Sequence, residues 1–329
     1  MRPPRFWQHD GILPRLLLPA AWLYDLAGRL RRHVVRPVHC GVPVICVGNL
    51  TAGGSGKTPM ALALIALLAR RGVHAHALTR GFGGRLRGPL RVDPAIHGAA
   101  EVGDEALLLA RSAPTWVSAN RAAGANAAVA AGAPLIVMDD GFQNPGLHKD
   151  LALLVIDGGV GLGNGRVHPA GPLREVPERA WARCDGAVQV GPDTAISVPL
   201  PAAMPALAAR MIPAREAAAL RGRPVVGFAG IGRPAKFFET LLELGVDLVS
   251  AHAFPDHHAY RDDEIMTLVE EAAAAGAELV TTAKDAVRLP PEARAMVTVV
   301  EATLEFAQPA VLESWLDRLS AAADPAGAA

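Results

Sequence analysis

The chain has 329 residues, of which 51% are hydrophobic and 19% charged, and this length favours two domains or one large one. Lysine and arginine together number 32, as do aspartate and glutamate, so the total charge gives no reason to expect nucleic-acid binding. The cysteines Cys40, Cys46 and Cys184 form no Cys-x-x-Cys pair. This argues against a disulfide framework or a zinc knuckle and is typical of a reducing compartment.

The first 36 residues depart from the neutral balance, with seven arginines against two aspartates. Their longest uncharged run, residues 16–24, is far shorter than the ~20 residues that span a bilayer, and no signal-peptide cleavage site follows it. Leu23, Leu26, Leu30 and Val34 recur at helical spacing, with arginines on another face. Such an amphipathic helix suits an anionic membrane surface, but docking on the protein's own core explains the pattern equally well.

A glycine-rich loop lies between an apolar strand predicted over residues 44–47 and a helix predicted over residues 59–70. It ends in Gly56, Lys57 and Thr58. In this order of strand, loop and helix, backbone N–H groups and the helix N-terminus bind a polyphosphate. We therefore expect Lys57 to reach the β- and γ-phosphates and Thr58 to hold Mg²⁺. The general pattern has glycine where this chain has Thr51, and a plain glycine turn is the alternative.

Polar residues follow two further predicted strands. The strand over residues 74–78 leads to Arg80, which can grip a substrate phosphate, although a simple glycine turn explains the segment nearly as well. The apolar run 134–138 predicts a buried strand that ends in Asp139 and Asp140. This is the Walker B arrangement, in which a carboxylate meets the Mg²⁺ held by the phosphate-loop threonine. Two adjacent carboxylates favour the metal site over a solvated turn.

Two other groups of residues allow either a chemical or an ordinary interpretation. Asp104 and Glu105 precede a short apolar helix over residues 106–110, where acidic residues are common capping residues, and the pattern alone favours capping over catalysis. His257 and His258 follow Asp256 in a predicted loop. They suggest metal binding or acid–base chemistry, but adjacent histidines do not easily share one metal, and a loop histidine usually has no such role.

Prolines between residues 199 and 213 predict a break in the chain around residues 200–222. After it, strands at 224–229, 247–251 and 278–282 and helices at 234–244 and 262–275 indicate a second α/β unit. The predicted domains are a membrane-surface helix (1–36), a phosphate-loop domain (37–205), a smaller lobe (206–320) and a disordered tail (321–329). The fold class is α/β, with a P-loop NTPase-like parallel sheet that carries helices on both faces, a smaller C-terminal α/β lobe and an N-terminal amphipathic helix.

These features indicate a nucleotide-dependent phosphotransferase or hydrolase. A GTPase would carry Asn-Lys-x-Asp, whereas Lys284 and Asp285 are adjacent here and miss that spacing. An assembly or partitioning ATPase needs no second lobe with a base, whereas a kinase needs a phosphate cradle, Mg²⁺ and a base near the acceptor hydroxyl. We therefore favour a kinase, with the P-loop ATPase as the alternative.

The motifs follow one another in an order that resembles the tetraacyldisaccharide 4′-kinases, the lipid A kinases of Gram-negative bacteria, over residues 7–319. The resemblance implies transfer of the ATP γ-phosphate to the 4′-hydroxyl of tetraacyldisaccharide 1-phosphate, giving lipid IVA at the cytoplasmic face of the inner membrane. It also favours the membrane-surface interpretation of the N-terminal helix, and we expect a monomer. The motifs are residues 47–59, Arg80-Gly81-Phe82-Gly83, Val102-Gly103-Asp104-Glu105, Asp139-Asp140-Gly141-Phe142-Gln143, Gly171-Pro172-Leu173-Arg174-Glu175, Gly230-Ile231-Gly232, Phe254-Pro255-Asp256-His257-His258 and Lys284-Asp285.

The same resemblance implies roles for individual residues. Asp104 is the expected base for the sugar hydroxyl, paired with His257, while Arg80, Arg121 and Arg174 are candidates for the anionic lipid head group. Thr58, Glu105, Asp139 and Gln143 are expected around Mg²⁺. The expected ATP-binding residues are Thr51, Ala52, Gly53, Gly54, Ser55, Gly56, Lys57 and Thr58, with Lys57 also catalytic.

Overall fold

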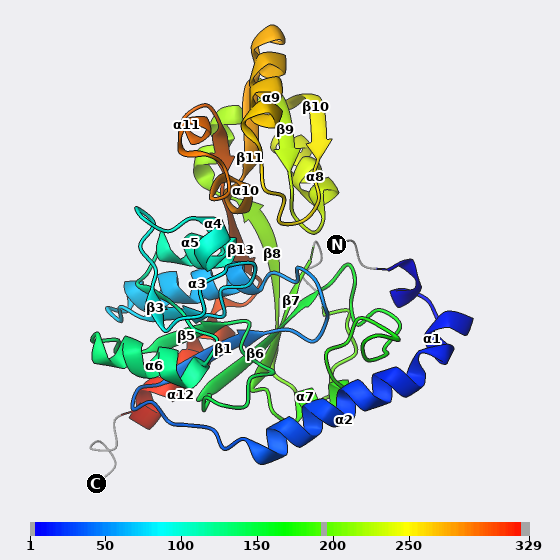
Figure 1. Ribbon diagram of the computed structural model, residues 1–329, viewed down its shortest axis with the longest axis vertical. Helices are drawn as coiled ribbons and strands as arrows, with labels where there is room; N and C mark the ends of the chain where they lie inside the picture. The colour runs from blue at the N-terminus through cyan, green and yellow to red at the C-terminus, as the bar shows by residue number, and fades with distance from the viewer. Residues whose placement is uncertain (1–3, 192–195, 324–329) are drawn as a thin grey trace.

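The computed structural model describes residues 4–191 and 196–323 and has two lobes, each built on its own β-sheet (Figure 1). In these described residues the large sheet has nine strands in the order β13-β8-β7-β6-β1-β5-β2-β4-β3. They are β1 (Val44–Gly48), β2 (His76–Thr79), β3 (Leu90–Arg91), β4 (Thr115–Val117), β5 (Ile136–Asp139), β6 (Leu151–Asp157), β7 (Gly186–Val190), β8 (Ala206–Pro213) and β13 (Ala302–Phe306).

Strand β1 lies in the middle of the large sheet, paired in parallel with β5 on one side and β6 on the other. The parallel pairing continues to β2 and β4 in one direction and to β7 and β8 in the other, while β3 and β13 pair antiparallel at the two edges. Every residue of β1, β5 and β6 is buried, as in a parallel sheet covered on both faces. Because parallel strands share one carboxyl edge, the loops after β1, β2, β4 and β5 gather there.

Helices cover both faces of this sheet and enclose two hydrophobic cores. On one face lie α3 (Lys57–Arg70), α5 (Asp104–Ala110) and α12 (Pro309–Ala323), whose Leu64, Leu109 and Trp315 share one core. On the other face lie α6 (Arg121–Ala130) and α7 (Pro177–Trp181), and short α4 (Ala99–Val102) precedes α5. The predicted α/β class, with helices on both faces of a parallel sheet, is confirmed.

The small lobe is a parallel sheet in the order β10-β9-β11-β12 between two helices. Helix α9 packs on one face and α8 on the other, each with its own core. The strands and helices predicted after residue 222 all form. The elements are η2 (Arg215–Leu220), β9 (Pro224–Ala229), α8 (Pro234–Leu244), β10 (Asp247–Ala253), α9 (Asp262–Ala274), β11 (Glu278–Thr282), α10 (Ala283–Ala286), α11 (Pro291–Arg294) and β12 (Thr298–Val300).

The division between the lobes differs from the expected boundary at residue 206. Strand β8 lies inside the segment where we expected a break, and it pairs with β7 and β13 of the large sheet. Pro205 precedes this strand and Pro213 ends it, so the prolines bound an element that they do not interrupt. Residues 302–323 also return to the large sheet as β13 and α12. The predicted tail begins inside α12, and residues 324–329 lie outside the described residues.

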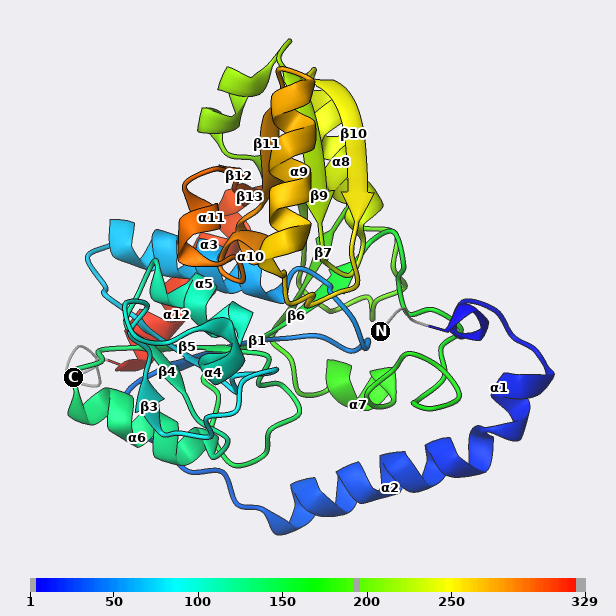
Figure 2. The same cartoon turned by 45° about the horizontal axis from the view of Figure 1, so that its top comes forward.

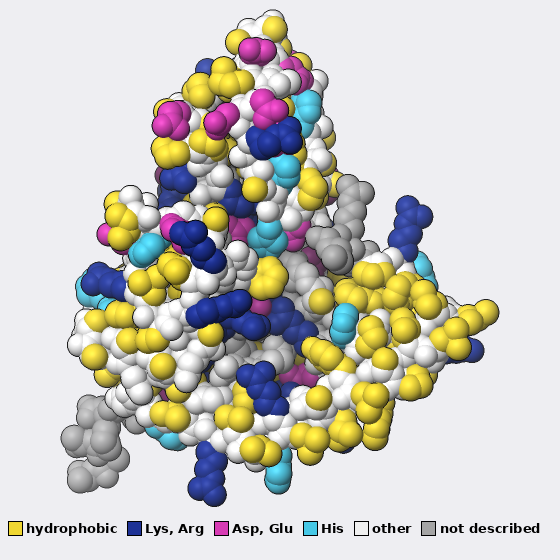
Figure 3. Space-filling view, viewed as in Figure 1, with side chains coloured by type: hydrophobic (Ala, Val, Ile, Leu, Met, Phe, Trp, Pro, Cys, Tyr) yellow, Lys and Arg dark blue, Asp and Glu magenta, His cyan; other side chains and the backbone are white. Residues whose placement is uncertain are grey.

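The N-terminal segment forms η1 (Arg5–Trp7), α1 (Ile12–Leu16) and the long α2 (Leu18–Val34), which runs along the outside of the large lobe next to α7 (Figures 1 and 2). Asp25 of α2 accepts two hydrogen bonds from Arg179, and Arg32 lies 3.5 Å from Glu175. The side chains of α1 and α2 that face solvent are largely apolar (Figure 3). Across the described residues, no helix has the length and apolar character needed to cross a membrane.

Candidate active site

The phosphate loop leads from β1 into α3. Gly56, with φ of +92°, precedes the helix, and no side chain caps the first N–H groups of α3. Uncapped N–H groups at a helix start are suited to bind an anion. Asn49 braces the loop from inside, because its Nδ2 donates to the carbonyl of Thr51 at 2.6 Å and that of Gly53 at 3.4 Å. The predicted strand, loop and helix therefore form with the geometry of a phosphate cradle.

Thr58 and Asp139 meet where β1 and β5 end side by side. The Thr58 hydroxyl donates a hydrogen bond of 2.8 Å to Asp139 Oδ2. Asp139 is fully buried, and its Oδ1 has no hydrogen-bond partner. Burial, together with the nearby Glu105 carboxylate, raises the pKa of Asp139 to about 7. A buried carboxylate oxygen without a partner, close to a second carboxylate, is what a bound cation would compensate.

The oxygen atoms of Thr58, Asp139 and Glu105 are suited to form part of a Mg²⁺ coordination sphere. Burial raises the pKa of Glu105 as well, although Lys284 and Lys57 oppose the shift. No group of three or more His, Cys, Asp and Glu in the described chain is arranged to hold a metal ion. A carboxylate pair with a hydroxyl still suits Mg²⁺, which keeps several water or phosphate oxygens when it binds to proteins.

Asp140 connects the phosphate loop to the loop before α7. Its backbone has a φ of +51°, and its carboxylate accepts hydrogen bonds of 2.7 and 3.2 Å from Arg174. Lys57 Nζ lies 3.9 Å from Asp140 Oδ2. Burial opposes ionisation here, but Lys57 and Arg174 outweigh it and lower the pKa of Asp140. Arg174, expected at the lipid head group, thus pairs with Asp140, and its contact with the lipid stays a prediction.

Gln143, expected at the metal, contacts other residues. Its Nε2 donates to the Asn49 carbonyl at 2.9 Å and to Glu175 at 3.3 Å, and its Oε1 accepts a hydrogen bond of 3.4 Å from Arg174. The amide therefore joins the phosphate-loop strand to the loop that carries Arg174 and Glu175. Its place among the Mg²⁺ ligands stays a prediction.

Arg80 and Arg121 follow neighbouring strands, β2 and β4, and lie close to each other. Arg121 begins α6 and is buried, and its Nη1 donates to the Ser118 carbonyl. Burial and the charge of Arg80 lower the pKa of Arg121 to about 10. Two guanidinium groups held together against their repulsion form a region suited to an anionic ligand.

Asp104 and His257 come from different lobes and form a hydrogen bond of 2.8 Å between Asp104 Oδ2 and His257 Nδ1. Asp104 starts α5 and is 3% exposed. Gly103 before it has a φ of +86°, and a Cβ there would lie 2.4 Å from the Phe82 carbonyl oxygen, so the approach needs glycine. Although burial raises it, the pKa of Asp104 lies below its ordinary value because of His257, Lys284 and Arg288. The aspartate therefore begins a helix and also holds the histidine.

Sequence comparison identifies the family to which this site belongs. Residues 13–321 match the family model for tetraacyldisaccharide-1-P 4′-kinase. The chain is 53% identical over 326 residues to the tetraacyldisaccharide 4′-kinase of Rhodospirillum rubrum, covering 97% of this chain and 98% of the relative. It is 57% identical over 327 residues to that of Gluconacetobacter diazotrophicus, covering 97% and 100%. The chain belongs to the tetraacyldisaccharide-1-P 4′-kinase family.

The fold matches a solved kinase of this family. The crystal structure of LpxK from Aquifex aeolicus, in complex with ATP, superposes with a TM-score of 0.76 at 26% sequence identity. The match covers 94% of this chain and 99% of that one. The family inferred from the order of the motifs is therefore confirmed, and both lobes belong to the shared fold.

Several residues of the kinase site were not assigned roles from the sequence. Asp140 is next to Asp139, a predicted Mg²⁺ ligand, and this position was the one indication in the sequence that Asp140 belongs to the site. Asn49 and Glu175 lie inside motifs of the sequence, but no role was predicted for them because their contacts depend on how the loops meet. Lys284 lies 3.8 Å from Asp104 across the two lobes, a contact that no local pattern predicts.

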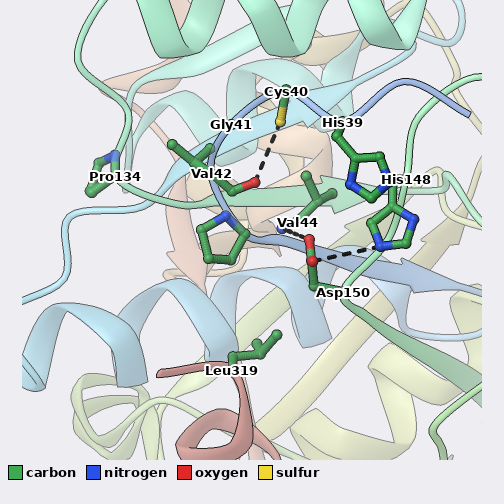
Figure 4. A pocket seen from close by; sticks show the side chains of 10 residues that line it. His39, Cys40, Gly41, Val42, Val44, Pro134, His148, Asp150 and Leu319 are labelled. Atoms are coloured by element: carbon green, nitrogen blue, oxygen red, sulfur yellow. Dashed lines mark hydrogen bonds and ion pairs between the residues drawn. The ribbon is translucent and has the colours of Figure 1, made fainter. Parts of the chain in front are cut away.

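A separate cavity of about 420 Å³ lies at the other end of β1, where the strand begins (Figure 4). The rings of His39 and His148 stack beside it with centroids 3.8 Å apart, and His148 Nε2 lies 3.6 Å from Asp150 Oδ1. None of the predicted site residues lines this cavity. It is therefore distinct from the kinase site at the carboxyl edge of the sheet.

Proposed function

We propose that the chain is an ATP-dependent kinase that phosphorylates the 4′-hydroxyl of tetraacyldisaccharide 1-phosphate, giving lipid IVA and ADP. The observation that carries this proposal is the contact of Asp104 with His257, next to Glu105, whose carboxylate interacts with Lys57 of the phosphate loop. A nucleotide hydrolase needs a phosphate loop and a metal site, whereas a phosphotransferase also needs a base for its acceptor. The family membership supports the same reaction.

The phosphate end of the reaction depends on Lys57 and the loop over residues 51–58. The loop N–H groups and the Lys57 ammonium hold the β- and γ-phosphates. Thr58, Glu105 and Asp139 would hold Mg²⁺, with Gln143 as a further expected ligand, and the ion neutralises charge on the phosphate oxygens when it is bound. The partnerless Oδ1 of Asp139 supports this assignment.

The acceptor end depends on Asp104. Its ionised carboxylate accepts the proton of the 4′-hydroxyl while the hydroxyl oxygen forms the bond to the γ-phosphorus and ADP leaves. His257 orients the carboxylate through their hydrogen bond. A lowered pKa keeps Asp104 ionised at neutral pH, ready to take the proton.

Binding of the lipid would involve the arginines and the N-terminal helices. Arg80, Arg121 and Arg174 are suited to the anionic head group, because guanidinium groups bind phosphate with good geometry. The exposed apolar side chains of α1 and α2 support attachment to the cytoplasmic face of the inner membrane, where the acyl chains of the substrate lie. We expect a monomer that does not bind nucleic acid.

Purified protein tests the proposal. We would measure ADP and 4′-phosphorylated lipid formed from ATP, Mg²⁺ and tetraacyldisaccharide 1-phosphate in detergent, with Asp104→Ala beside the wild type. We expect lipid-dependent product and a kcat at least about a hundredfold lower in D104A, as for loss of a general base. Asp93→Ala, an exposed aspartate of the same lobe, is the matched control and should retain activity. Lipid-independent ATP hydrolysis without phosphorylated lipid would instead favour the ATPase.

A further inference from the structure

Lys284 contacts both members of the Asp104–His257 pair from the small lobe. It is the second residue of α10, immediately after β11. Its Nζ lies 3.4 Å from His257 Nε2 and 3.8 Å from Asp104 Oδ2. Asp256 Oδ1 is 3.6 Å away, and 26% of the Lys284 side chain is exposed. The ammonium group therefore lies where the two lobes meet, within 4 Å of both the imidazole and the base.

The backbone that carries Lys284 is fixed by a buried network. Asp285 is fully buried and accepts hydrogen bonds from the Gly230 N–H at 2.8 Å and the Tyr260 hydroxyl at 2.7 Å. Arg288 pairs with Asp285, and its Nε donates to the Lys284 carbonyl at 3.1 Å. The lysine thus extends from a rigid part of the lobe, so its ammonium group can hold a second side chain in place.

The chemistry of the ammonium group determines which imidazole nitrogen carries the proton. An ammonium group has three donors and no acceptor, so its hydrogen bond to His257 Nε2 requires a lone pair on that nitrogen. In the neutral imidazole the proton then lies on Nδ1, and the Nδ1–H group donates a hydrogen bond to Asp104. Asp256 Oδ2, 3.7 Å from Nε2, favours the opposite arrangement, with the proton on Nε2.

We propose that Lys284 is a positioning residue that sets the tautomer of His257, keeping Nε2 unprotonated so that Nδ1–H is donated to Asp104. The inference rests on the proposed role of Asp104 as the base. Asp104 Oδ1 accepts the N–H of Glu105 at 2.9 Å, and Nδ1–H holds Oδ2, so both carboxylate oxygens are fixed. Without Lys284, Asp256 draws the proton to Nε2, and the Nδ1 lone pair then faces the carboxylate and repels it.

The test is ¹⁵N NMR of histidine-labelled protein at about pH 8, where an ordinary histidine is neutral. His257→Asn assigns the His257 signals by their disappearance. We expect an unprotonated Nε2 in the wild type and a protonated Nε2 in Lys284→Met, with Lys284→Arg close to the wild type. Lys236→Met, in α8 of the same lobe, is the matched control and should leave both signals unchanged.

Kinetics give the second readout. We expect kcat of K284M to fall about 10- to 100-fold, which is the usual loss when a residue that orients another active-site side chain is removed. KM for ATP should stay within about twofold. A protonated Nε2 in the wild type, or an unchanged Nε2 signal in K284M, would overturn the proposal. If K284M does not fold, the wild-type spectrum still tests the proposal, because a protonated Nε2 there overturns it. Absence of lipid phosphorylation by the wild type would overturn the proposed function, and the tautomer would still be read separately.

Discussion

At the scale of single residues, the site holds backbone conformations that most side chains avoid. Among the described residues, Asp140 and His257 are the non-glycine residues with positive φ, at +51° and +59°. Such a conformation costs of order 1–3 kcal/mol and persists where surrounding contacts fix it. Arg174 holds the Asp140 carboxylate, and the His257 N–H donates to the Gly230 carbonyl at 3.1 Å. Both residues are therefore placed by the fold, against their local preference.

Asp139 makes the stability of the metal-free protein depend on pH. Its pKa of about 7 in the folded state exceeds the ordinary value of 3.8, so between these pH values the folded state binds a proton that the unfolded state has lost. The free energy of unfolding therefore falls as pH rises from 5 to about 7. We expect this group to lower the free energy of unfolding by about 3 kcal/mol between pH 5 and pH 8, measured by denaturant unfolding in EDTA.

Asp139→Asn removes the titrating group and should flatten that part of the pH profile while abolishing most activity. Added Mg²⁺ should stabilise the wild type more at pH 8 than at pH 5, because a cation compensates the ionised carboxylates. Parallel pH profiles for wild type and D139N in EDTA would show that burial does not raise this pKa in the folded protein.

At the scale of elements, α2 reverses the usual orientation of an amphipathic helix. Its buried residues are Ala21 and Asp25, whereas Trp22 and Leu23 are 58% and 60% exposed. Ion pairs with Arg179 and Glu175 hold the helix on the large lobe. An amphipathic helix normally buries its apolar face, so the exposed one here favours the membrane-surface interpretation over docking on the core.

Charge on the outer face of α2 should weaken membrane binding without harming the fold. We expect Leu23→Glu with Leu30→Glu to reduce flotation with anionic liposomes at least about tenfold, because burying each charge at the interface is costly. The Tm and the activity on detergent-solubilised lipid should stay close to wild type. Ile96→Glu, a similarly exposed apolar side chain elsewhere, is the control. Equal flotation of the double variant would contradict membrane binding through α2.

At the scale of the whole molecule, the site lies where two lobes with separate cores meet. The chain passes from β8 through η2 to β9 and returns from β12 to β13, so two crossings join the lobes. Asp104 belongs to the large lobe, whereas His257 and Lys284 belong to the small one. Catalytic geometry therefore depends on how the small lobe is held, and Asp285 is its buried anchor.

Asp285→Asn should loosen the small lobe selectively. It removes the closer of two carboxylate partners from Arg288, whose side chain is 5% exposed and whose Nε also lies 3.7 Å from Asp104 Oδ2. Breaking a buried ion pair costs about 3–5 kcal/mol. In hydrogen–deuterium exchange we expect faster exchange over residues 224–300 and unchanged protection in β1, β5 and β6. Asp247→Asn, an exposed residue of β10, should change neither region. Equal loss of protection in both lobes would mean that they unfold as one unit.

Much of the local structure followed from the sequence, because strand and helix periodicity depend on near neighbours. The apolar run before the phosphate loop predicted β1, and the segments after residue 222 predicted β9, β10, β11, α8 and α9 at nearly their observed bounds. Strand β8 was missed because its flanking prolines resemble those of a linker. Its pairing with β7 and β13 joins residues far apart in the chain, and the proline content of a segment does not predict such pairing.

The kinase family, the α/β class and the phosphate loop could all be predicted before the structure was known, since each depends on residues close together in the chain or on the order of motifs. The motifs also indicated that Thr58 and Asp139 share one site and that Asp104 pairs with His257, and these side chains do form hydrogen bonds. The contact of Lys284 with Asp104 was found only in the tertiary structure, because it depends on how the two lobes meet. The tertiary structure also showed that the apolar face of α2 points outward. Periodicity shows which residues share a helix face, but it does not show whether protein or solvent covers that face.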